Sequence, residues 1–332
     1  MEPAILIISN SHDRSVNLVT THLDLLGKEY YRLNVDLLTS GSSLTLSLME
    51  DFTVQIRDIE TTRISGVGVK SVWWRRPEIP SLSLKLPPDQ EEFATTEWQT
   101  ALWSFYTSFR SAFWVNQPLI GFRLLEHNKL YQMSLAREVG LKIPKSLVTN
   151  SFEDLRKFCR SQGGILALKT LKGHFFNSQN TDGTTSLGVI YTNLVSLEQI
   201  EESERDIHLC PVLAQEYIEK KIELRVTVVG NEIFSCAINS QDSVRTLHDW
   251  RRYDFARVRH ESYVLPLEIK EKILLFMKKC EIVFGAIDLI VTPENEYVFL
   301  EVNPNGQWSW IESLTGMQIS KAIAEILVNP PL

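Results

Sequence analysis

Three polar residues near the end of the chain, Asp288, Glu301 and Asn303, have types and spacing that suit metal chemistry. They belong to the segment FGAIDLIVTPENEYVFLEVNPNGQW, in which apolar residues alternate on both sides of the turn-forming sequence Pro-Glu-Asn-Glu. This pattern predicts a β-hairpin. If the turn closes at that sequence, pairing runs from Thr292 opposite Tyr297 to Asp288 opposite Glu301. Asn303 then shares the face of the two carboxylates, because side chains alternate along a strand.

A hairpin with two opposed carboxylates needs a positive charge between them, because like charges in this position are destabilising. Carboxylate and amide oxygens are ligands for Mg²⁺, which also leaves positions for phosphate oxygens. The sequence therefore predicts a magnesium site formed by Asp288, Glu301 and Asn303. If the register slipped by one residue, the same carboxylates would be solvated at the edge of a sheet. The apolar residues between them are expected on the opposite face: Val298, Leu300 and Val302.

Further polar residues occupy positions where the surrounding pattern predicts buried structure. Lys169 ends the apolar strand GGILALK, and Lys129 lies in the first turn of a helix that begins near residue 126. A cation at the positive end of a helix is better placed beside an anion such as phosphate, although a lone lysine there is more often simply solvated. Buried polar groups require partners, so three more in apolar strands suggest a ligand site. These are Glu223, Arg225 and Asn239.

Two clusters of charge allow both a binding and a structural interpretation. Arg75 and Arg76 follow the strand sequence Val-Trp-Trp and precede a proline, which suits bidentate binding of a carboxylate. Alternatively, the two tryptophans belong to the core and the arginines pair with surface acids. The predicted helix over residues 196–205 either presents a solvated face or binds a basic peptide. Its acidic character comes from four glutamates: Glu198, Glu201, Glu202 and Glu204.

The elements that carry these residues follow from periodicity and chain breakers. A strand over residues 4–8, a helix over 16–26 and a strand over 29–36 indicate the start of an α/β domain with parallel strands. A long aromatic-rich helix is expected over 91–114, followed by a link at 116–121. The remaining predicted elements are a helix over 126–139, a strand ending at Lys169, a glycine-rich hairpin at 171–188, a hairpin turning at Gly230 and Asn231, and helices over 266–284 and 319–327.

Composition argues against several classes of function. The 332-residue chain is 44% hydrophobic and carries a net charge of -7, with a pI near 5.6. It therefore lacks the positive charge expected of a general binder of nucleic acid or of an anionic membrane. Its four cysteines are widely separated and show no zinc-binding spacing, which indicates reduced thiols in a cytoplasmic protein. No apolar run approaches the roughly 20 residues that span a bilayer, and no signal peptide is evident.

Taken in chain order, these motifs resemble those of the ATP-grasp superfamily, in which two α+β lobes sandwich ATP. The resemblance covers residues 126–329, and residues 1–118 resemble the α/β domain that usually precedes them. It implies that Lys129 and Lys169 contact the nucleotide phosphates, and that Arg225 stabilises the transferring phosphoryl group. It also implies that the three hairpin residues bind Mg²⁺. The residues implied around the adenine and ribose of ATP are Gln215, Glu216, Tyr217, Ile218, Glu223 and Asn239.

A closer resemblance is to the graspetide synthetases, which mature microviridin-type peptides. It rests on SVWWRRPE, HNKLYQMSLAREVGL, CPVLAQEYIEKKIELRVTVVG and GAIDLIVTPENEYVFLEVNPNGQW, together with AINSQ, DW-R and ISKAIAEILVN. Such enzymes use ATP to activate Asp or Glu side chains of a ribosomal precursor peptide, and then close ester or amide links to Ser, Thr or Lys side chains. The resemblance implies an ADP-forming ligase that uses ATP and Mg²⁺, binds the leader and core of a precursor, and is compatible with a homodimer.

The expected fold is ATP-grasp, with α/β and α+β parts. We expect a pre-ATP-grasp domain over 1–120, a central lobe over 121–212, and a C-terminal lobe with the metal site over 213–332. By the same resemblance, the leader docks near Glu198, Glu201 and Glu202, and Arg75 or Arg76 steers the acidic core peptide. Two alternatives are an ATP-grasp ligase that adds an amino acid or small amine to a protein or small-molecule carboxylate, and a nucleotide-dependent binding protein without catalytic activity.

Overall fold

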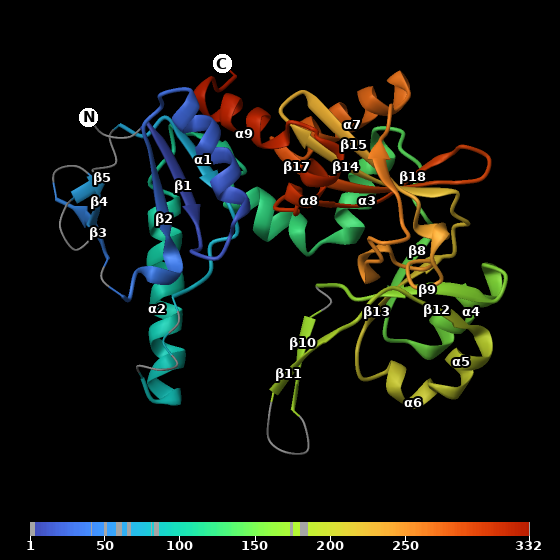
Figure 1. Ribbon diagram of the computed structural model, residues 1–332. Helices are drawn as coiled ribbons and strands as arrows, with labels where there is room; N and C mark the ends of the chain where they lie inside the picture. The colour runs from blue at the N-terminus through green and yellow to red at the C-terminus, as the bar shows by residue number, and fades with distance from the viewer. Residues whose placement is uncertain are drawn as a thin grey trace.

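The computed structural model describes residues 4–40, 42–49, 52–57, 62–64, 68–80, 82, 86–172, 175–179 and 185–331. Within these ranges the chain forms an N-terminal domain, a central lobe and a C-terminal lobe (Figure 1). The N-terminal domain lies against the C-terminal lobe, and the central lobe lies below the latter in the view of Figure 1.

The N-terminal domain is built on a parallel sheet with the strand order β2-β1-β6-β7. Ile5 and Ile7 of β1 pack toward α1, while Leu6 and Ile8 pack toward α2. Both faces of the sheet are covered, which explains why β1 is apolar throughout rather than alternating. The elements of this domain are β1 (Ile5–Ser9), α1 (Ser15–Leu25), β2 (Tyr30–Asn34), η1 (Val35–Leu37), β3 (Ser43–Leu48), β4 (Phe52–Arg57), β5 (Thr62–Ile64), β6 (Ser71–Trp74), α2 (Pro88–Tyr106) and β7 (Phe113–Val115).

The helix expected over 91–114 is shorter than predicted. It ends at Tyr106, and Phe113–Val115 forms the edge strand β7. The indole nitrogen of Trp114 donates to the carbonyl of Phe109 at 3.0 Å, and the ring packs in the core beside α2. The aromatic residues that suggested one helix are thus divided between a helix and a strand, since Phe, Trp and Val fit a strand well.

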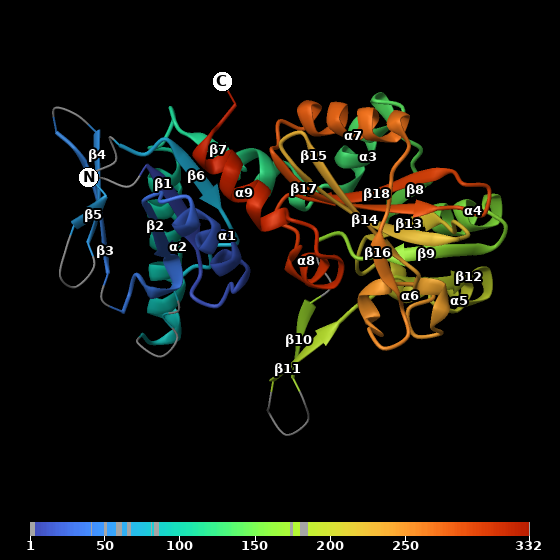
Figure 2. The same ribbon diagram turned by 45° about the horizontal axis from the view of Figure 1, so that its top comes forward.

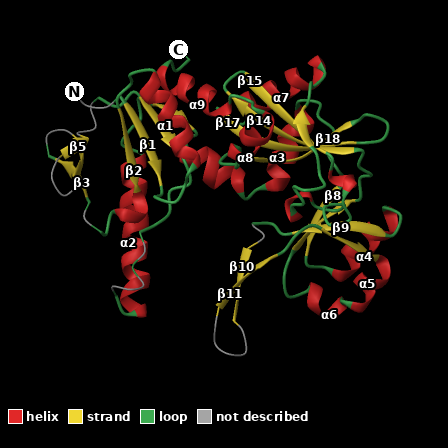
Figure 3. Cartoon of the chain, in the orientation of Figure 1, coloured by secondary structure: helices red, strands yellow, loops and turns green. Residues whose placement is uncertain are grey.

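The central lobe is an antiparallel sheet in the order β12-β9-β13-β8, with one face covered by α4, α5 and α6. Its core is formed by residues such as Leu155, Cys159, Leu166 and Ala214. A hairpin of β10 and β11 projects away from this lobe (Figure 3), and its turn lies outside the described residues. The elements are β8 (Ser146–Thr149), α4 (Phe152–Ser161), β9 (Ile165–Lys169), β10 (Phe175–Gln179), β11 (Thr185–Val189), β12 (Asn193–Ser196), α5 (Leu197–Glu202), α6 (Glu204–Ile207) and β13 (Val212–Glu216).

The C-terminal lobe is an antiparallel sheet in the order β16-β15-β14-β17-β18. Helices α3 and α7 cover one face, as Figure 2 shows, and α8 and α9 pack on the other. The elements are η2 (Leu119–Glu126), α3 (Lys129–Glu138), β14 (Ile222–Val229), β15 (Glu232–Ile238), η3 (Ser240–Asp242), η4 (Trp250–Arg252), β16 (His260–Ser262), α7 (Leu267–Lys279), β17 (Phe284–Val291), β18 (Tyr297–Asn303), α8 (Ser309–Thr315) and α9 (Ile319–Val328).

The N-terminal domain and the C-terminal lobe share one hydrophobic core. Ile5, Ile7 and Trp73 from the parallel sheet belong to the same buried cluster as Phe284 and Trp308 from the C-terminal lobe. Helix α9 contributes five buried residues to this cluster and packs directly against α1. These five are Ile319, Ala322, Ile323, Ala324 and Leu327, and the partly buried Ile326 and Val328 pack against the cluster.

The hairpin of β17 and β18 places Asp288 opposite Glu301, as predicted, but its outer register differs. Val291 pairs with Tyr297 rather than Val298, and a bulge next to Asp288 restores the predicted pairing. The bulge leaves Leu300 out of the ladder and turns it into the same pocket as Glu301, so the expectation that Leu300 faces away is wrong. The turn is tighter by one residue because Asn295 adopts a left-handed conformation, with φ 62°.

Two predictions drawn from composition have structural counterparts. All four cysteines carry free thiols, and Cys159, Cys236 and Cys280 are buried. Among the described helices, none has the length and apolar character needed to cross a membrane.

Candidate active site

A pocket between the central sheet and the C-terminal sheet collects most of the residues predicted to bind ATP. The central lobe contributes the end of β9 and the end of β13, and the C-terminal lobe contributes β14, β17 and β18. The first turn of α3 closes one side. The predicted residues that line this pocket are Lys129, Lys169, Gln215, Glu216, Tyr217, Ile218, Glu223, Asp288 and Glu301.

Glu301 is surrounded by cations. Its Oε2 lies 3.0 Å from Lys129 Nζ, and its Oε1 lies 3.8 Å from Arg251 Nη1. Burial by itself raises the pKa of a carboxyl group, but Lys129, Arg251 and Lys169 outweigh it and hold the pKa of Glu301 well below its usual value. Glu301 is therefore ionised at neutral pH, as a metal-binding carboxylate must be.

Asp288, on the facing strand, is paired with Arg225. Arg225 Nη1 donates to Asp288 Oδ1 at 2.8 Å. Burial raises the pKa of Asp288, Arg225 opposes this shift, and the neighbouring Glu301 raises the pKa further. Two carboxylates that repel each other in this way favour a divalent cation between them.

Arg225 lies beneath the pocket rather than in its lining. Besides Asp288, it contacts the carbonyl of Gln307 through Nη2 at 3.4 Å, and its buried Nε has no hydrogen-bond partner among the described residues. A Cβ at Gly306 would lie 2.9 Å from Arg225 Nη2 and 2.3 Å from the Cβ of Ala286. Only glycine therefore allows the loop after β18 to approach the guanidinium this closely.

Lys169 occupies the opposite wall, at the end of β9. Burial lowers the pKa of Lys169 to about 8; Glu301 opposes this shift, while Lys129 and Arg251 reinforce it. No salt bridge joins Lys169 to another residue in the described part of the chain. A polyphosphate in the pocket would supply the negative charge that this ammonium group needs.

The segment that joins β13 to β14 forms the edge of the pocket expected to hold adenine and ribose. Gln215 is buried and donates through Nε2 to Ser146 Oγ at 2.9 Å, and Glu216 Oε1 accepts from the backbone nitrogen of Lys145 at 2.8 Å. Glu223 forms an ion pair with Lys220 at 3.0 Å. Burial raises the pKa of Glu223, and Lys220 opposes that shift. These contacts fix the segment so that Tyr217 and Ile218 face the pocket.

Arg251 and Asp249 were not predicted as site residues, yet both line the pocket. Asp249 is 3% exposed and accepts from Arg251 through both oxygens, at 2.8 and 2.7 Å. It also accepts from the backbone nitrogen of Thr192 in the central lobe, at 2.9 Å. Burial opposes ionisation, but these bonds lower the pKa of Asp249 to about 2. The DW-R motif was the only sequence signal here, because a loop has no periodicity to interpret.

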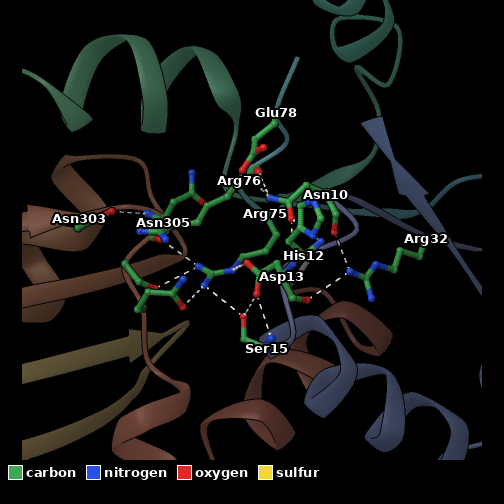
Figure 4. Close-up of polar contacts among 12 residues, drawn as sticks. Asn10, His12, Asp13, Ser15, Arg32, Arg75, Arg76, Glu78, Asn303 and Asn305 are labelled. Atoms are coloured by element: carbon green, nitrogen blue, oxygen red, sulfur yellow. Dashed lines mark hydrogen bonds and ion pairs between the residues drawn. The ribbon is translucent and has the colours of Figure 1, made fainter. Parts of the chain in front are cut away.

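The loop after β18 is fastened by the N-terminal domain (Figure 4). Asn303 Oδ1 accepts from the backbone nitrogen of Asn305 at 2.9 Å. The carbonyl of Asn305 in turn accepts from Arg75 Nη1 at 2.9 Å and from Arg76 Nε at 2.8 Å. Asn303 is not among the residues that line the pocket, but it ends the strand that carries Glu301, and this loop orients its amide.

Arg75 has a structural role, which corrects the expectation that it steers a peptide. It is 1% exposed, and its Nε binds Asp13 at 2.9 Å. Its remaining donors bind the loop after β18 and α1, at Asn305, Gly306, Gln307 and Ser15. No donor is left for a substrate carboxylate. Trp73 and Trp74 are buried, so the core interpretation of these tryptophans is confirmed.

Three further predictions concern residues away from the pocket. Asn239 does not line it, and its side chain donates to the carbonyl of Arg259 at 3.3 Å and to Glu261 at 3.2 Å. Arg76 lines a separate cavity beside α2. The acidic residues Glu198, Glu201 and Glu202 lie on α5, which is on the outer side of the central lobe (Figure 1), and their role in docking a leader stays a prediction.

Two known domain families match this chain. Residues 4–119 match the MvdD pre-ATP grasp domain, and residues 126–327 match the RimK-like ATP-grasp domain. A comparison with curated proteins found no match.

One similar solved structure is a RiPP-associated ATP-grasp ligase of Chryseobacterium gregarium, in complex with ADP and a leader and core peptide. It is 30% identical to this chain, with a TM-score of 0.89, and the match covers 100% of this chain and 98% of that one. Macrocyclase MdnC of Microcystis aeruginosa, bound with precursor peptide MdnA, is 32% identical with a TM-score of 0.84, covering 98% and 100%. The ATP-grasp ligase PsnB, solved with a precursor variant, Mg and ADP, is 19% identical with a TM-score of 0.76, covering 99% and 98%, and shows the shared fold.

The two domain matches are consecutive and together cover nearly all of the chain, in the order that the sequence predicts. The RimK-like match alone spans more than half of it. The chain therefore belongs to the ATP-grasp family, as a member in which an MvdD-type pre-ATP-grasp domain precedes a RimK-like ATP-grasp domain.

Proposed function

We propose that this protein is an ATP-dependent peptide macrocyclase, which activates Asp or Glu side chains of a ribosomal precursor peptide and links them to Ser, Thr or Lys side chains of the same peptide. The observation that carries the proposal is full-length similarity, at 30% and 32% identity, to two ligases solved with precursor peptides. The pocket supports it, because lysines and opposed carboxylates converge where a nucleoside triphosphate and its metal ion would lie.

The nucleotide would lie with its base at the segment 215–218 and its phosphates beside Lys129 and Lys169. This arrangement fits because the base edge is built from fixed backbone and apolar side chains, whereas the opposite end is cationic. Arg251, held rigidly by Asp249, adds a third cation at the phosphate end. A fixed guanidinium loses little freedom when it binds an anion, so Arg251 is well suited to contact phosphate.

The residues present also fit Mg²⁺. Asp288 and Glu301 face each other across the hairpin, and Asn303 offers an amide oxygen from the same strand as Glu301. Among the described residues no group of three or more His, Cys, Asp or Glu side chains forms a metal site, so the remaining ligands would be phosphate oxygens and water. When bound, Mg²⁺ would neutralise the phosphate oxygens and orient the terminal phosphoryl group.

The chemistry needs positioned charges rather than a nucleophilic side chain of the enzyme. An oxygen of the peptide carboxylate attacks the terminal phosphorus of ATP, which gives an acyl phosphate and ADP. The hydroxyl or amine of the same peptide then attacks the acyl carbon, loses its proton, and releases inorganic phosphate. Lys129, Lys169 and Arg251 stabilise the negative charge that moves between these groups, while the enzyme holds both ends of the peptide together.

Mass spectrometry of a precursor peptide tests this function. The peptide would consist of a leader and a core that contains repeated Thr and Glu or Asp residues, and it would be incubated with the protein, ATP and Mg²⁺. We expect the loss of one water per link and the release of one ADP per link. An unchanged peptide mass, combined with ADP release when free amino acids are supplied, would instead indicate a ligase for small amines.

We place the protein in the cytoplasm, where ATP and newly made ribosomal peptides are both present and where its four cysteines would stay reduced. The bounds 1–120, 121–212 and 213–332 remain our prediction for the pre-ATP-grasp domain and the two lobes. A homodimer remains a prediction from resemblance.

A further inference from the structure

Five aromatic side chains form a closed cluster beside the active-site pocket. Each ring contacts the next in a circle, with neighbouring centroids 5.1 to 5.7 Å apart. Aromatic pairs attract each other at such separations. The rings come from η4 and the turn after it, from β16 and from α8. In order around the circle, the members of this aromatic cluster are Trp250, Tyr253, Phe255, His260 and Trp310.

Trp250 joins the aromatic cluster to the active site. It lines the pocket, and the Arg225 guanidinium that binds Asp288 lies 5.7 Å from the centre of its ring. The backbone nitrogen of Tyr253 donates to the carbonyl of Trp250 at 3.1 Å, and the two rings meet edge to face. Tyr253 therefore lies beside the end of the pocket that holds Asp288.

The hydroxyl of Tyr253 lies within range of the charges at that end. Burial raises the pKa of Tyr253, Arg225 and Arg251 oppose this shift, and Asp288 reinforces it. Electrostatic interactions weaken with distance and are screened by solvent, so these influences agree with the ring contacts. Both observations put Tyr253 next to the place where the phosphates would react.

Packing alone does not account for the two outer rings of the aromatic cluster. Tyr253 and Phe255 are stacked with an angle of 20° between their planes, yet they are 42% and 53% exposed. Tyr253 also has φ 38°, a left-handed conformation that is uncommon for a residue with a bulky side chain. An exposed ring gains little from burial, and backbone strain of this kind is typical of functional positions.

We propose that Tyr253 and Phe255 shield the acyl phosphate from water, and thereby direct its acyl group to the peptide nucleophile. This inference rests on the proposed function, since the acyl phosphate arises only there. In the productive step the hydroxyl or amine of the peptide bonds to the acyl carbon and loses its proton, and the bond from that carbon to the phosphate oxygen breaks. Water that attacks the same carbon breaks the same bond and regenerates the carboxylate, so ATP is hydrolysed to ADP and phosphate without a link. Two large apolar rings at the reacting end exclude this competitor.

The first test measures how many ADP molecules are released for each link that mass spectrometry detects. We expect about one ADP per link for the unmodified protein and for Tyr253→Phe, which keeps the ring, but about three or more for Tyr253→Ala. Phe255→Ala should also raise the ratio, and it removes a ring that is 53% exposed, so the fold does not depend on it. Phe93→Ala is the matched control, because Phe93 is 70% exposed on α2 and should leave the ratio unchanged.

The second test makes water the only acceptor. A leader-core peptide that keeps its Asp or Glu but has no Ser, Thr or Lys in the core can form an acyl phosphate that only water can resolve. Tyr253→Ala should release ADP from this peptide at least about fivefold faster than the unmodified protein does. Replacing the acidic core residues by Asn or Gln should abolish the difference, which separates hydrolysis of the acyl phosphate from direct hydrolysis of ATP.

An unchanged ratio of ADP to links in both Tyr253→Ala and Phe255→Ala would overturn the inference. Weaker peptide binding with an unchanged ratio would also overturn it, because the two rings would then belong to a peptide-binding surface. Failure of the proposed function is distinguishable, since the unmodified protein would then form no link in any leader-core peptide.

Discussion

At the scale of single residues, the two hairpin carboxylates differ in how much charge surrounds them. Glu301 has Lys129, Lys169 and Arg251 nearby, whereas Asp288 has Arg225 at hydrogen-bonding distance. Neutralising Glu301 therefore leaves three cations without their shared anion. Neutralising Asp288 leaves mainly one cation, Arg225, without its partner. Removing one partner of a buried ion pair is costly because the other charge remains buried.

Glu301→Gln should accordingly destabilise the protein more than Asp288→Asn does, while both abolish peptide cyclisation. We expect a loss of activity of at least about 100-fold for each variant, since each removes a proposed ligand of the metal ion that would orient the phosphates. Thermal unfolding without nucleotide ranks the two stabilities, and ADP release measures activity. Equal melting temperatures for the two variants would contradict the charge argument, and full activity in either would contradict the metal assignment.

Lys169 gives the active site a pH dependence whose sign follows from its lowered pKa. Its pKa is about 8 in the free protein, and a neighbouring phosphate would raise it. Above pH 8 the lysine must therefore take up a proton when ATP binds. ATP affinity should therefore be highest, and constant, below pH 8. Above pH 8 it should fall by up to about tenfold per pH unit.

Lys169→Arg provides the control for this dependence, because arginine stays protonated throughout the range. ATP affinity of this variant, measured by calorimetry, should stay constant between about pH 7 and pH 9.5, because the ordinary pKa of arginine lies well above this range. A wild-type profile as flat as that of Lys169→Arg would show that Lys169 does not contact the phosphates.

At the scale of elements, β18 is held in place by side chains from outside its sheet. Gln132 on α3 accepts from the Val302 nitrogen at 2.9 Å and donates to the carbonyls of Val302 and Leu125 at 3.0 and 2.7 Å. Asn116 donates to the carbonyls of Phe284 and Pro304 at 2.7 and 2.9 Å. Gln132 thus fixes the backbone of the strand that carries Glu301 and Asn303, and Asn116 fixes the residue that follows it.

Gln132→Met keeps the size of the side chain but leaves buried backbone groups of Val302 unpaired. We expect it to lower the free energy of unfolding by about 2–4 kcal/mol and to raise the Mg²⁺ concentration needed for half-maximal activity. Arg137→Met, an exposed position on the same helix, is the control and should change neither quantity appreciably. If Mg²⁺ dependence is the same in both variants, the amide supports the fold without positioning the metal ligands.

The hairpin shows what sequence reasoning can and cannot provide. Alternation around the turn predicted the hairpin and placed Asp288 opposite Glu301, but the outer register it gave is off by one residue, and the pairing of the two carboxylates holds because a bulge restores it. The bulge that redirects Leu300 could not be predicted, since it depends on the left-handed backbone of Asn295 and on packing across the sheet. Likewise, Arg75 and Arg76 are adjacent in sequence, and only the approach of the Asn305 loop gives one a structural role and leaves the other at a cavity.

At the scale of the whole molecule, we expect the N-terminal domain and the C-terminal lobe to unfold as one cooperative unit and the central lobe to unfold as another. The first two share a core that includes α1 and α9, whereas the central lobe has its own cluster around Leu155. Leu213 is an exception, because it comes from β13 and packs with the C-terminal lobe. The sequence predicted the order of these parts but not the shared core, which joins segments from the two ends of the chain.

Leu155→Ala should therefore destabilise the central lobe selectively. Leu155 is 1% exposed, and its truncation should cost that lobe about 2–5 kcal/mol. Hydrogen exchange should accelerate in β9 and β13 but not in β1 or β14. Val19→Ala, in the shared core, is the matched variant and should accelerate exchange in the N-terminal domain and the C-terminal lobe together. Uniform acceleration across the chain in both variants would indicate a single cooperative unit.

The shared core also bears on how such enzymes can diversify. The sheet and helices of the central lobe occupy a single stretch of the chain, between β8 and β13, so recombination can exchange them through two junctions, provided that the residue at position 213 of β13 still packs against the C-terminal lobe as Leu213 does. The N-terminal domain offers no such freedom, because α9, at the other end of the chain, completes its packing against α1. A foreign N-terminal domain would thus need a matching C-terminal helix, which ties the evolution of the two ends of the gene together.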